Sequence, residues 1–106
     1  MSDQKRPKHH TNLSKHFPEI FSALDNLGTT LRGAGPLDRK TSELIQLGAA
    51  AAVQSEGSVH SHTRRALEAG ADRKEIQHTL LLLISTIGFP RVAAAMSWAE
   101  DVLEKP

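Results

Sequence analysis

The chain has 106 residues, of which 39% are hydrophobic and 24% are charged, the size and composition of one ordinary soluble domain. Its 13 basic and 12 acidic residues are mixed along the sequence, which excludes the broad basic face that a nucleic-acid partner requires. The absence of cysteine excludes disulfides, thiolate metal sites and thiol redox chemistry. Only 4% of residues are aromatic, so the core must consist of aliphatic side chains, and a domain this small is expected to oligomerise.

The amino-terminal residues 1–12 are polar and charged, and we expect them to form a disordered tail ahead of one folded domain over residues 13–106. His9 and His10 stand in this tail, where solvated histidines are expected rather than a metal site. Residues 1–12 contain no apolar segment of the kind that a secretory signal needs. The longest apolar run, LLLLISTIG (80–88), is far shorter than the roughly 20 residues of a membrane span. A cytoplasmic protein with no membrane partner is therefore expected.

The first half of the sequence predicts two helices, and no period-two alternation indicates a strand. The first helix is expected to begin near Phe17 with Pro18 in its first turn, and to end within RGAGP (32–36). Its apolar face is expected to bury Ile20, Phe21, Leu24 and Leu27. The second helix is expected to start at Asp38, a favourable N-cap, and to continue through SELIQLGAAAAVQ (42–54), whose small residues allow another helix to approach closely.

The second half predicts three more helices, which gives an all-α bundle of about five to six helices. The third covers residues 55–69 and stops at Gly70, which suits a left-handed cap. Asp72 and Glu75 form a capping box that opens the fourth helix. That helix should be buried on every side, partly by another subunit, because it carries six large apolar residues: Leu80, Leu81, Leu82, Leu83, Ile84 and Ile87. Gly88 and Pro90 end it, and the fifth helix carries Val92, Met96, Trp98, Val102 and Leu103.

Three segments carry a resemblance to a known family: LDRKTSELIQLGAAAAV (37–53), HTRRALEAGADRKEI (62–76) and IGFPRVAAAMSWAEDVL (87–103). They resemble the carboxymuconolactone decarboxylase family, in particular its alkylhydroperoxidase AhpD-like branch, over about residues 17–104. The resemblance implies a homotrimer or homohexamer. It also implies a site, since redox members carry a Cys-x-x-Cys pair seven and four residues before a histidine, with a glutamate twelve residues before the first cysteine. The corresponding residues here are Ser55, Ser58, His62 and Glu43.

The replacement of both cysteines by serine changes the chemistry that this site can support. A serine hydroxyl ionises far less readily than a thiol, and serine cannot cycle through a disulfide. Peroxidase activity is therefore not expected of this sequence.

A glutamate, two hydroxyls and a histidine remain as candidate catalytic residues. Ser55, Ser58 and His62 share one helical face because they stand at i, i+3 and i+7. Glu43 would orient His62, which would then deprotonate Ser58 or a water molecule near neutral pH. The purely structural alternative is that Ser55 caps the third helix, Ser58 bonds locally, and Glu43 and His62 form a satisfied buried pair.

The other polar residues give weaker indications, and no metal ion or cofactor is expected. His60 lies about 200° around the helix from His62, so these two side chains cannot easily coordinate the same metal ion. Glu43, Ser58 and His62 are expected to face one pocket between the second and third helices. His78 is expected at the surface, with that pocket or a subunit boundary as the alternatives. Three arginines are candidates to hold a substrate carboxylate or are simply solvated: Arg64, Arg65 and Arg91.

Three functions are consistent with these observations. The first is a non-redox decarboxylase or lactone-type enzyme acting on a small carboxylic acid, with His62 as acid or base. The second is a lapsed family member that binds a small ligand or a partner. The third is a thiol peroxidase whose two cysteines have been replaced by Ser55 and Ser58.

Overall fold

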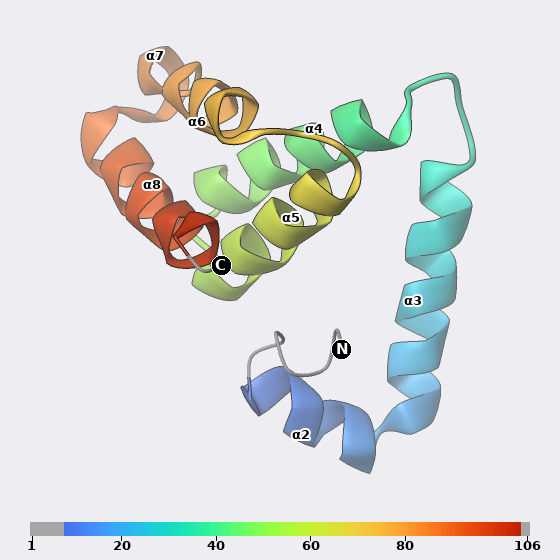
Figure 1. The fold of residues 1–106 in the computed structure, drawn as a ribbon. Coiled ribbons are helices and arrows are strands. Elements are labelled where there is room, and N and C mark those ends of the chain that lie inside the picture. The colour runs from blue at the N-terminus through green and yellow to red at the C-terminus, as the bar shows by residue number, and fades with distance from the viewer. Residues whose placement is uncertain (1–7, 105–106) are drawn as a thin grey trace. The chain divides into compact units, whose positions relative to one another are not determined.

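A computed structural model describes residues 8–104, and every regular element within that range is helical (Figure 1). The all-α prediction is thus confirmed for these residues. The elements are α2 (Lys8–His16), α3 (Pro18–Arg32), α4 (Arg39–Ala52), α5 (Glu56–Glu68), α6 (Arg73–Leu81), α7 (Ile84–Ile87) and α8 (Phe89–Leu103). Within residues 8–104, no helix is long and apolar enough to cross a membrane.

The chain divides into two compact units, residues 1–37 and residues 38–106. The first contains α2 and α3, and the second contains α4 to α8. The boundary predicted after residue 12 falls inside α2, in which residues 8–12 are helical. No glycine or proline interrupts Lys8–His16, so its backbone forms a helix although it carries few apolar side chains. The rest of the predicted tail, residues 1–7, lies outside the described residues.

Helix α3 begins where the sequence predicts, but its apolar face is not buried. Phe17 is the N-cap residue, Pro18 occupies the first turn, and the helix ends at Gly33. No residue of α3 is buried: Phe21 is half-buried, and the exposed fractions are 57% for Ile20, 53% for Leu24 and 53% for Leu27. The predicted burial of these four side chains is therefore not achieved within their own unit, because a unit of two helices has no further layer to enclose them.

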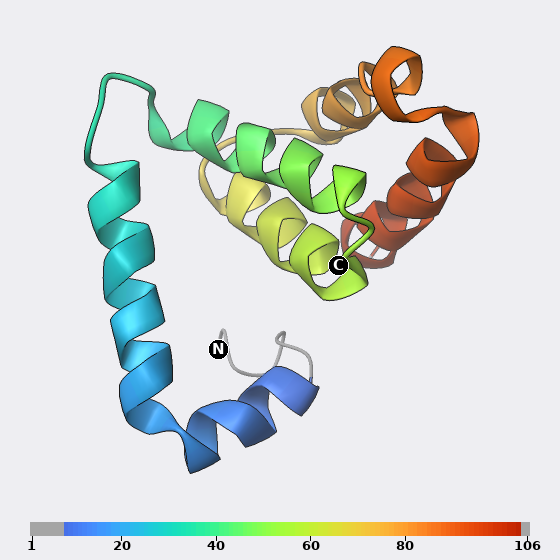
Figure 2. The ribbon, with the colours of Figure 1, turned by 180° about the vertical axis from the view of Figure 1, so that it is seen from behind.

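The core of the second unit is built from aliphatic residues of α4, α5, α6 and α8. In both ribbon views α4 and α5 run side by side, and α5 also packs against α8 (Figures 1 and 2). The fully buried large apolar side chains are Leu47, Val59, Ile76, Leu80 and Val92. Six buried alanines belong to the same core, and the five that lie on helices permit the close helix approach that the sequence predicts: Ala50, Ala51, Ala66, Ala95 and Ala99, with Ala71 after α5 as the sixth.

The predicted caps are confirmed at the helix termini. Asp38 caps α4 by accepting a hydrogen bond from the Thr41 N–H at 2.8 Å. At the start of α6, Asp72 accepts from the Glu75 N–H at 2.8 Å, and Glu75 accepts from the Asp72 N–H at 3.1 Å. These two bonds complete the capping box. Gly70, with φ of +101°, follows α5 in the conformation that favours glycine.

The predicted fourth helix is interrupted. Helix α6 ends at Leu81, and the separate short helix α7 covers Ile84–Ile87. The break is a turn in which the Leu83 N–H donates to the Leu80 carbonyl. Of the apolar residues in this stretch only Leu80 is buried, whereas the exposed fraction is 63% for Leu82.

The Lys40–Glu75 ion pair joins α4 to α6, and its contribution to the stability of the fold should depend on pH. Lys40 Nζ lies 2.9 Å from Glu75 Oε2, and this bond, together with the Asp72 N–H, holds the pKa of Glu75 below its ordinary value. A lowered carboxyl pKa stabilises the fold above the ordinary value, and this stabilisation is lost as the pH falls through the folded-state pKa. We therefore expect Glu75→Gln to flatten the loss of thermal stability below roughly pH 4.5.

Thermal unfolding followed by circular dichroism from pH 3 to 7 measures this difference. Asp25→Asn, which alters an exposed carboxylate of α3, is the matched control and should leave the profile unchanged. A profile for Glu75→Gln as steep as that of the unaltered chain would show that the pair does not contribute.

Candidate functional site

Helices α4 and α5 bring Glu43 and His62 into direct contact. Glu43 lies in the second turn of α4 and His62 in the middle of α5, and these two helices pack along their lengths. His62 Nδ1 lies 2.9 Å from Glu43 Oε1. Glu43 is fully buried, whereas 18% of the His62 side chain is accessible. The predicted proximity of these two residues is confirmed.

This geometry fixes which imidazole nitrogen is available for chemistry. When Nδ1 carries the proton it donates to the carboxylate, and Nε2 then presents its lone pair. Nε2 has no hydrogen-bond partner within residues 8–104, and it is not one of the buried polar atoms without a partner in that range, which agrees with the partial exposure of the His62 side chain. A histidine oriented by a buried carboxylate, with its second nitrogen accessible, has the arrangement of a general base.

The two serines do not complete a hydrogen-bonded triad in the described part of the chain. Ser55 is the N-cap of α5, and its hydroxyl accepts from the Ser58 N–H at 3.4 Å, as the structural alternative predicts. Ser58 is half-buried one turn before His62, on the same face of α5. No hydrogen bond joins the Ser58 hydroxyl to the imidazole among the described residues. The structure thus brings Glu43 and His62 together and leaves the serines beside them.

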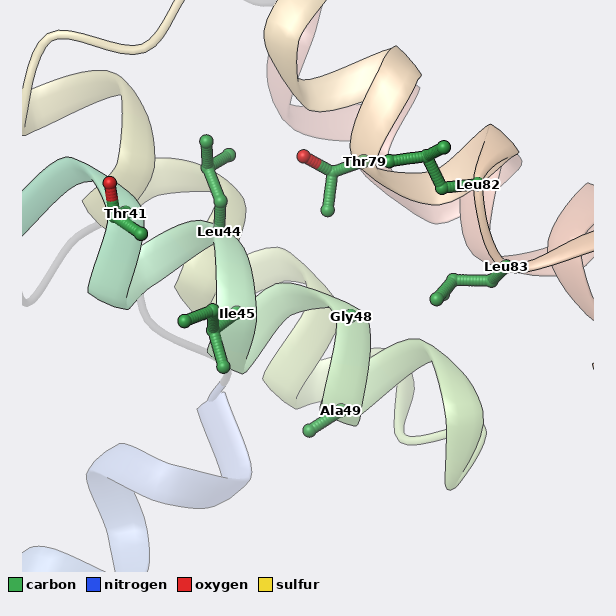
Figure 3. A pocket seen from close by; sticks show the side chains of 8 residues that line it. All are labelled: Thr41, Leu44, Ile45, Gly48, Ala49, Thr79, Leu82 and Leu83. Carbon is green, nitrogen blue, oxygen red and sulfur yellow. The ribbon is translucent and has the colours of Figure 1, made fainter. Parts of the chain in front are cut away.

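An open, apolar hollow lies beside α4 in the second unit. It has a volume of about 460 Å³ and lies between α4 and the α6–α7 segment (Figure 3). It is lined by Thr41, Leu44, Ile45, Gly48, Ala49, Thr79, Leu82 and Leu83. None of the four predicted site residues lines it. The small buried side chains of α4 let α5 pack closely, while the break after Leu81 leaves space beside α6.

Thr63, next to His62, is a buried polar residue that the sequence does not single out. It is fully buried, and its hydroxyl has no hydrogen-bond partner within the described range. An unsatisfied buried hydroxyl costs about 1–3 kcal/mol. Thr63→Val should therefore raise the free energy of unfolding by about 1 kcal/mol in urea denaturation.

Thr79→Val is the matched control for this prediction. The Thr79 hydroxyl donates to the Glu75 carbonyl at 2.8 Å, so the same substitution removes a bond there. It should lower the free energy of unfolding by about 0.5–1.5 kcal/mol. Destabilisation by both substitutions would contradict the assignment of Thr63 as unsatisfied.

The remaining polar candidates are two histidines, His60 and His78, and three arginines, of which Arg64 is half-buried on α5. His60 Nε2 contacts Asp101 Oδ2 on α8 at 2.9 Å, consistent with the prediction that His60 and His62 do not share one ion. His78 and Arg91 are exposed, and Arg65 is half-buried.

The arrangement of these helices is that of the carboxymuconolactone decarboxylase fold. The crystal structure of apo-lpg0406, a carboxymuconolactone decarboxylase family protein from Legionella pneumophila, matches with a TM-score of 0.74 and 28% sequence identity. The match covers 90% of this chain and 88% of that one. The sequence pattern of the carboxymuconolactone decarboxylase family matches residues 18–101, and the chain belongs to this family.

Two relatives from Methanocaldococcus jannaschii are also similar to the chain over most of its length. The uncharacterized protein MJ1511 is 30% identical over 92 residues, which are 87% of this chain and 83% of that protein. The uncharacterized protein MJ0742 is 28% identical over 94 residues, which are 88% and 86% of the two chains. The family match includes Glu43, Ser55, Ser58 and His62.

Proposed function

We propose that this carboxymuconolactone decarboxylase family protein carries out non-redox acid–base chemistry on a small carboxylic acid or lactone in the cytoplasm. His62 acts as the general base or acid, Glu43 orients it, and Ser58 donates a hydrogen bond to the substrate. Ser55 contributes by capping α5 and so fixing the start of the helix that carries the other two. The single observation that supports this function is the 2.9 Å contact of His62 Nδ1 with a buried carboxylate while Nε2 remains accessible.

The experiment is a thermal-shift screen of the purified chain against small carboxylic acids and lactones, followed by a turnover assay on each compound that binds. His62→Gln should abolish turnover, because glutamine has no titrating nitrogen. His78→Gln, which alters an exposed histidine of α6, is the matched control and should retain it. A compound that is turned over equally fast by His62→Gln would contradict the assignment of His62.

A second candidate is a lapsed enzyme that only binds a small apolar ligand. The observation that favours it is the hollow beside α6, whose lining is almost entirely apolar and excludes the Glu43–His62 pair. Ligands that stabilise the chain without being consumed, and whose binding is weakened by Gly48→Leu but not by His62→Gln, would support it. Gly48 lines the hollow, so a leucine there would fill part of it.

A third candidate is an AhpD-like thiol peroxidase whose two redox cysteines have been replaced by Ser55 and Ser58. The chain with Ser55 and Ser58 should not reduce peroxide at the expense of a dithiol, because methionine, its only sulfur-containing residue, forms neither a sulfenate nor a disulfide. If Ser55→Cys combined with Ser58→Cys gains this activity and Ser58→Cys alone does not, the third candidate is supported. Peroxide reduction by the unaltered, metal-free chain would overturn the stated expectation.

We also propose that the chain self-associates, as a homotrimer or homohexamer. The supporting observation is the apolar surface around the hollow, where the exposed fraction is 54% for Ile45 and 63% for Leu82. Surface of this kind is usually covered in a stable assembly. In sedimentation experiments Leu82→Glu should dissociate the assembly, whereas Val53→Glu, at an exposed apolar residue outside the hollow, should not. A stable monomer of the unaltered chain at micromolar concentration would contradict self-association.

A further inference from the structure

A second cluster of potential ligand atoms lies where α5 meets α8. Glu56 and His60 stand one turn apart on α5, at i and i+4, and Asp101 faces them from α8. Each offers one ligand atom, and these three atoms lie within 4.8 Å of one another. His60 Nε2 already contacts Asp101 Oδ2 at 2.9 Å. Because His60 and His62 are two residues apart on one helix, this cluster lies on a different face of α5 from the Glu43–His62 pair.

The charges of this cluster are unbalanced. Two carboxylates meet one imidazole in this cluster. Among the described residues Glu56 makes no ion pair, and the ion pair of Asp101 is with His60. Two anionic groups held this close repel each other, and a bound cation removes that repulsion.

The donor set selects the kind of cation. Two carboxylate oxygens and one imidazole nitrogen form a borderline set that suits first-row divalent ions, Zn²⁺ among them, better than Ca²⁺ or Mg²⁺, which prefer oxygen ligands alone. Two ligand atoms on one tetrahedral Zn²⁺ ion are about 3.5 Å apart, given bond lengths of about 2.0–2.2 Å. Small rotations of the exposed Glu56 and Asp101 side chains close the remaining difference.

The backbones that carry these ligands are fixed by core packing. Val59, next to His60, is fully buried in α5, and Ala99 in α8 is 2% exposed. Both belong to the hydrophobic core. Glu56 and His60 are four residues apart on α5, so their side chains lie on the same face of that helix. Asp101 reaches the same point from α8, which packs against α5. Three protein ligands leave at least one coordination position for water.

We propose that Glu56, His60 and Asp101 form a binding site for a divalent transition-metal ion, for which Zn²⁺ is the probe. The site is separate from the acid–base function proposed for Glu43 and His62, and neither depends on the other. A bound ion also joins α5 to α8, so it stabilises the second unit by mass action.

Isothermal titration calorimetry of the full, metal-free chain with Zn²⁺ tests the proposal. The background chain carries His9→Ala and His10→Ala, so that Zn²⁺ binding by these two adjacent histidines cannot contribute to the titration. On this background we expect one saturable site. Loss of an outer-shell partner typically weakens metal binding about 10–100-fold, so loss of a direct ligand in His60→Ala or Asp101→Asn should weaken it at least about tenfold.

Two controls separate this site from the rest of the molecule. His78→Gln and Asp25→Asn remove an exposed histidine and an exposed carboxylate elsewhere and should leave the Zn²⁺ affinity unchanged. Zn²⁺ should also raise the unfolding temperature of the background chain but not that of Asp101→Asn, provided that the circular dichroism of the variant is unaltered. Absence of a saturable site, or equal affinity in the unaltered and Asp101→Asn chains, would overturn the proposal and leave His60–Asp101 as a surface ion pair.

Discussion

Leu80→Ala should lower the free energy of unfolding by about 2–5 kcal/mol, the range for deleting a fully buried leucine side chain. Leu80 is 0% exposed and lies on α6 within the core of the second unit. Its removal forfeits the burial of its own methyl groups and leaves a cavity that its neighbours fill only in part. Core alanines, which have no rotamers to adjust, limit how far the site can collapse.

Leu81→Ala is the matched control, since it makes the same chemical change one residue further along the same helix. The exposed fraction of Leu81 is 44%, so its truncation should cost less than half as much as that of Leu80. Urea denaturation under identical conditions measures both. A loss below about 1 kcal/mol for Leu80→Ala would contradict its placement in the core.

The helix termini of the second unit could be predicted from sequence because their signals are local. Asp38 caps α4 through a bond that spans three residues, and the capping box between Asp72 and Glu75 also closes over three. Gly70 supplies a positive φ that no neighbouring side chain has to induce. Such contacts depend only on residues close together in the sequence, and the folded chain retains them.

Burial could not be predicted in the same way, because it depends on which elements meet in space. Residues 80–83 are four consecutive leucines, yet only Leu80 is fully buried, Leu83 packs against the core while partly exposed, and Leu82 is largely exposed. A run without polar residues gives no periodicity from which to choose the inner face. The burial of the apolar side chains of α3 could not be predicted for a related reason. Amphipathic spacing identifies the apolar face of a helix but not the element that covers that face.

The Glu43–His62 pair and the His60–Asp101 contact differ in how far the sequence predicts them. Helical spacing alone places Ser58 and His62 on one face, whereas Glu43, nineteen residues before His62, was paired with it through the family resemblance. Asp101, 41 residues after His60, could not be assigned to it from sequence, because neither spacing nor the resemblance links α5 to α8 at that point. Thr63 was missed since a buried threonine looks like any other helical threonine in a sequence.

His62→Leu should lower the free energy of unfolding by about 1.5–3 kcal/mol, the range for losing a hydrogen bond to a charged group. The substitution removes the donor that lies 2.9 Å from Oε1 of the fully buried Glu43. Glu43→Leu should cost less, because an apolar group of similar volume then replaces the carboxylate and the imidazole remains partly accessible. When both are leucine, the loss should be smaller than for His62→Leu alone, since no buried carboxylate is left without that donor.

A double-mutant cycle from urea denaturation measures this coupling, which should be about 1–3 kcal/mol. His60 and Asp101 provide the matched control, because their contact has the same 2.9 Å distance but the Asp101 side chain is 56% exposed. Exposed pairs typically couple by about 0.2–1 kcal/mol, so a cycle on His60 and Asp101 in metal-free buffer should give the smaller value. Equal coupling in the two cycles would show that burial of Glu43 does not strengthen its bond to His62. Additive losses for Glu43 and His62 would remove the physical basis for treating them as one unit.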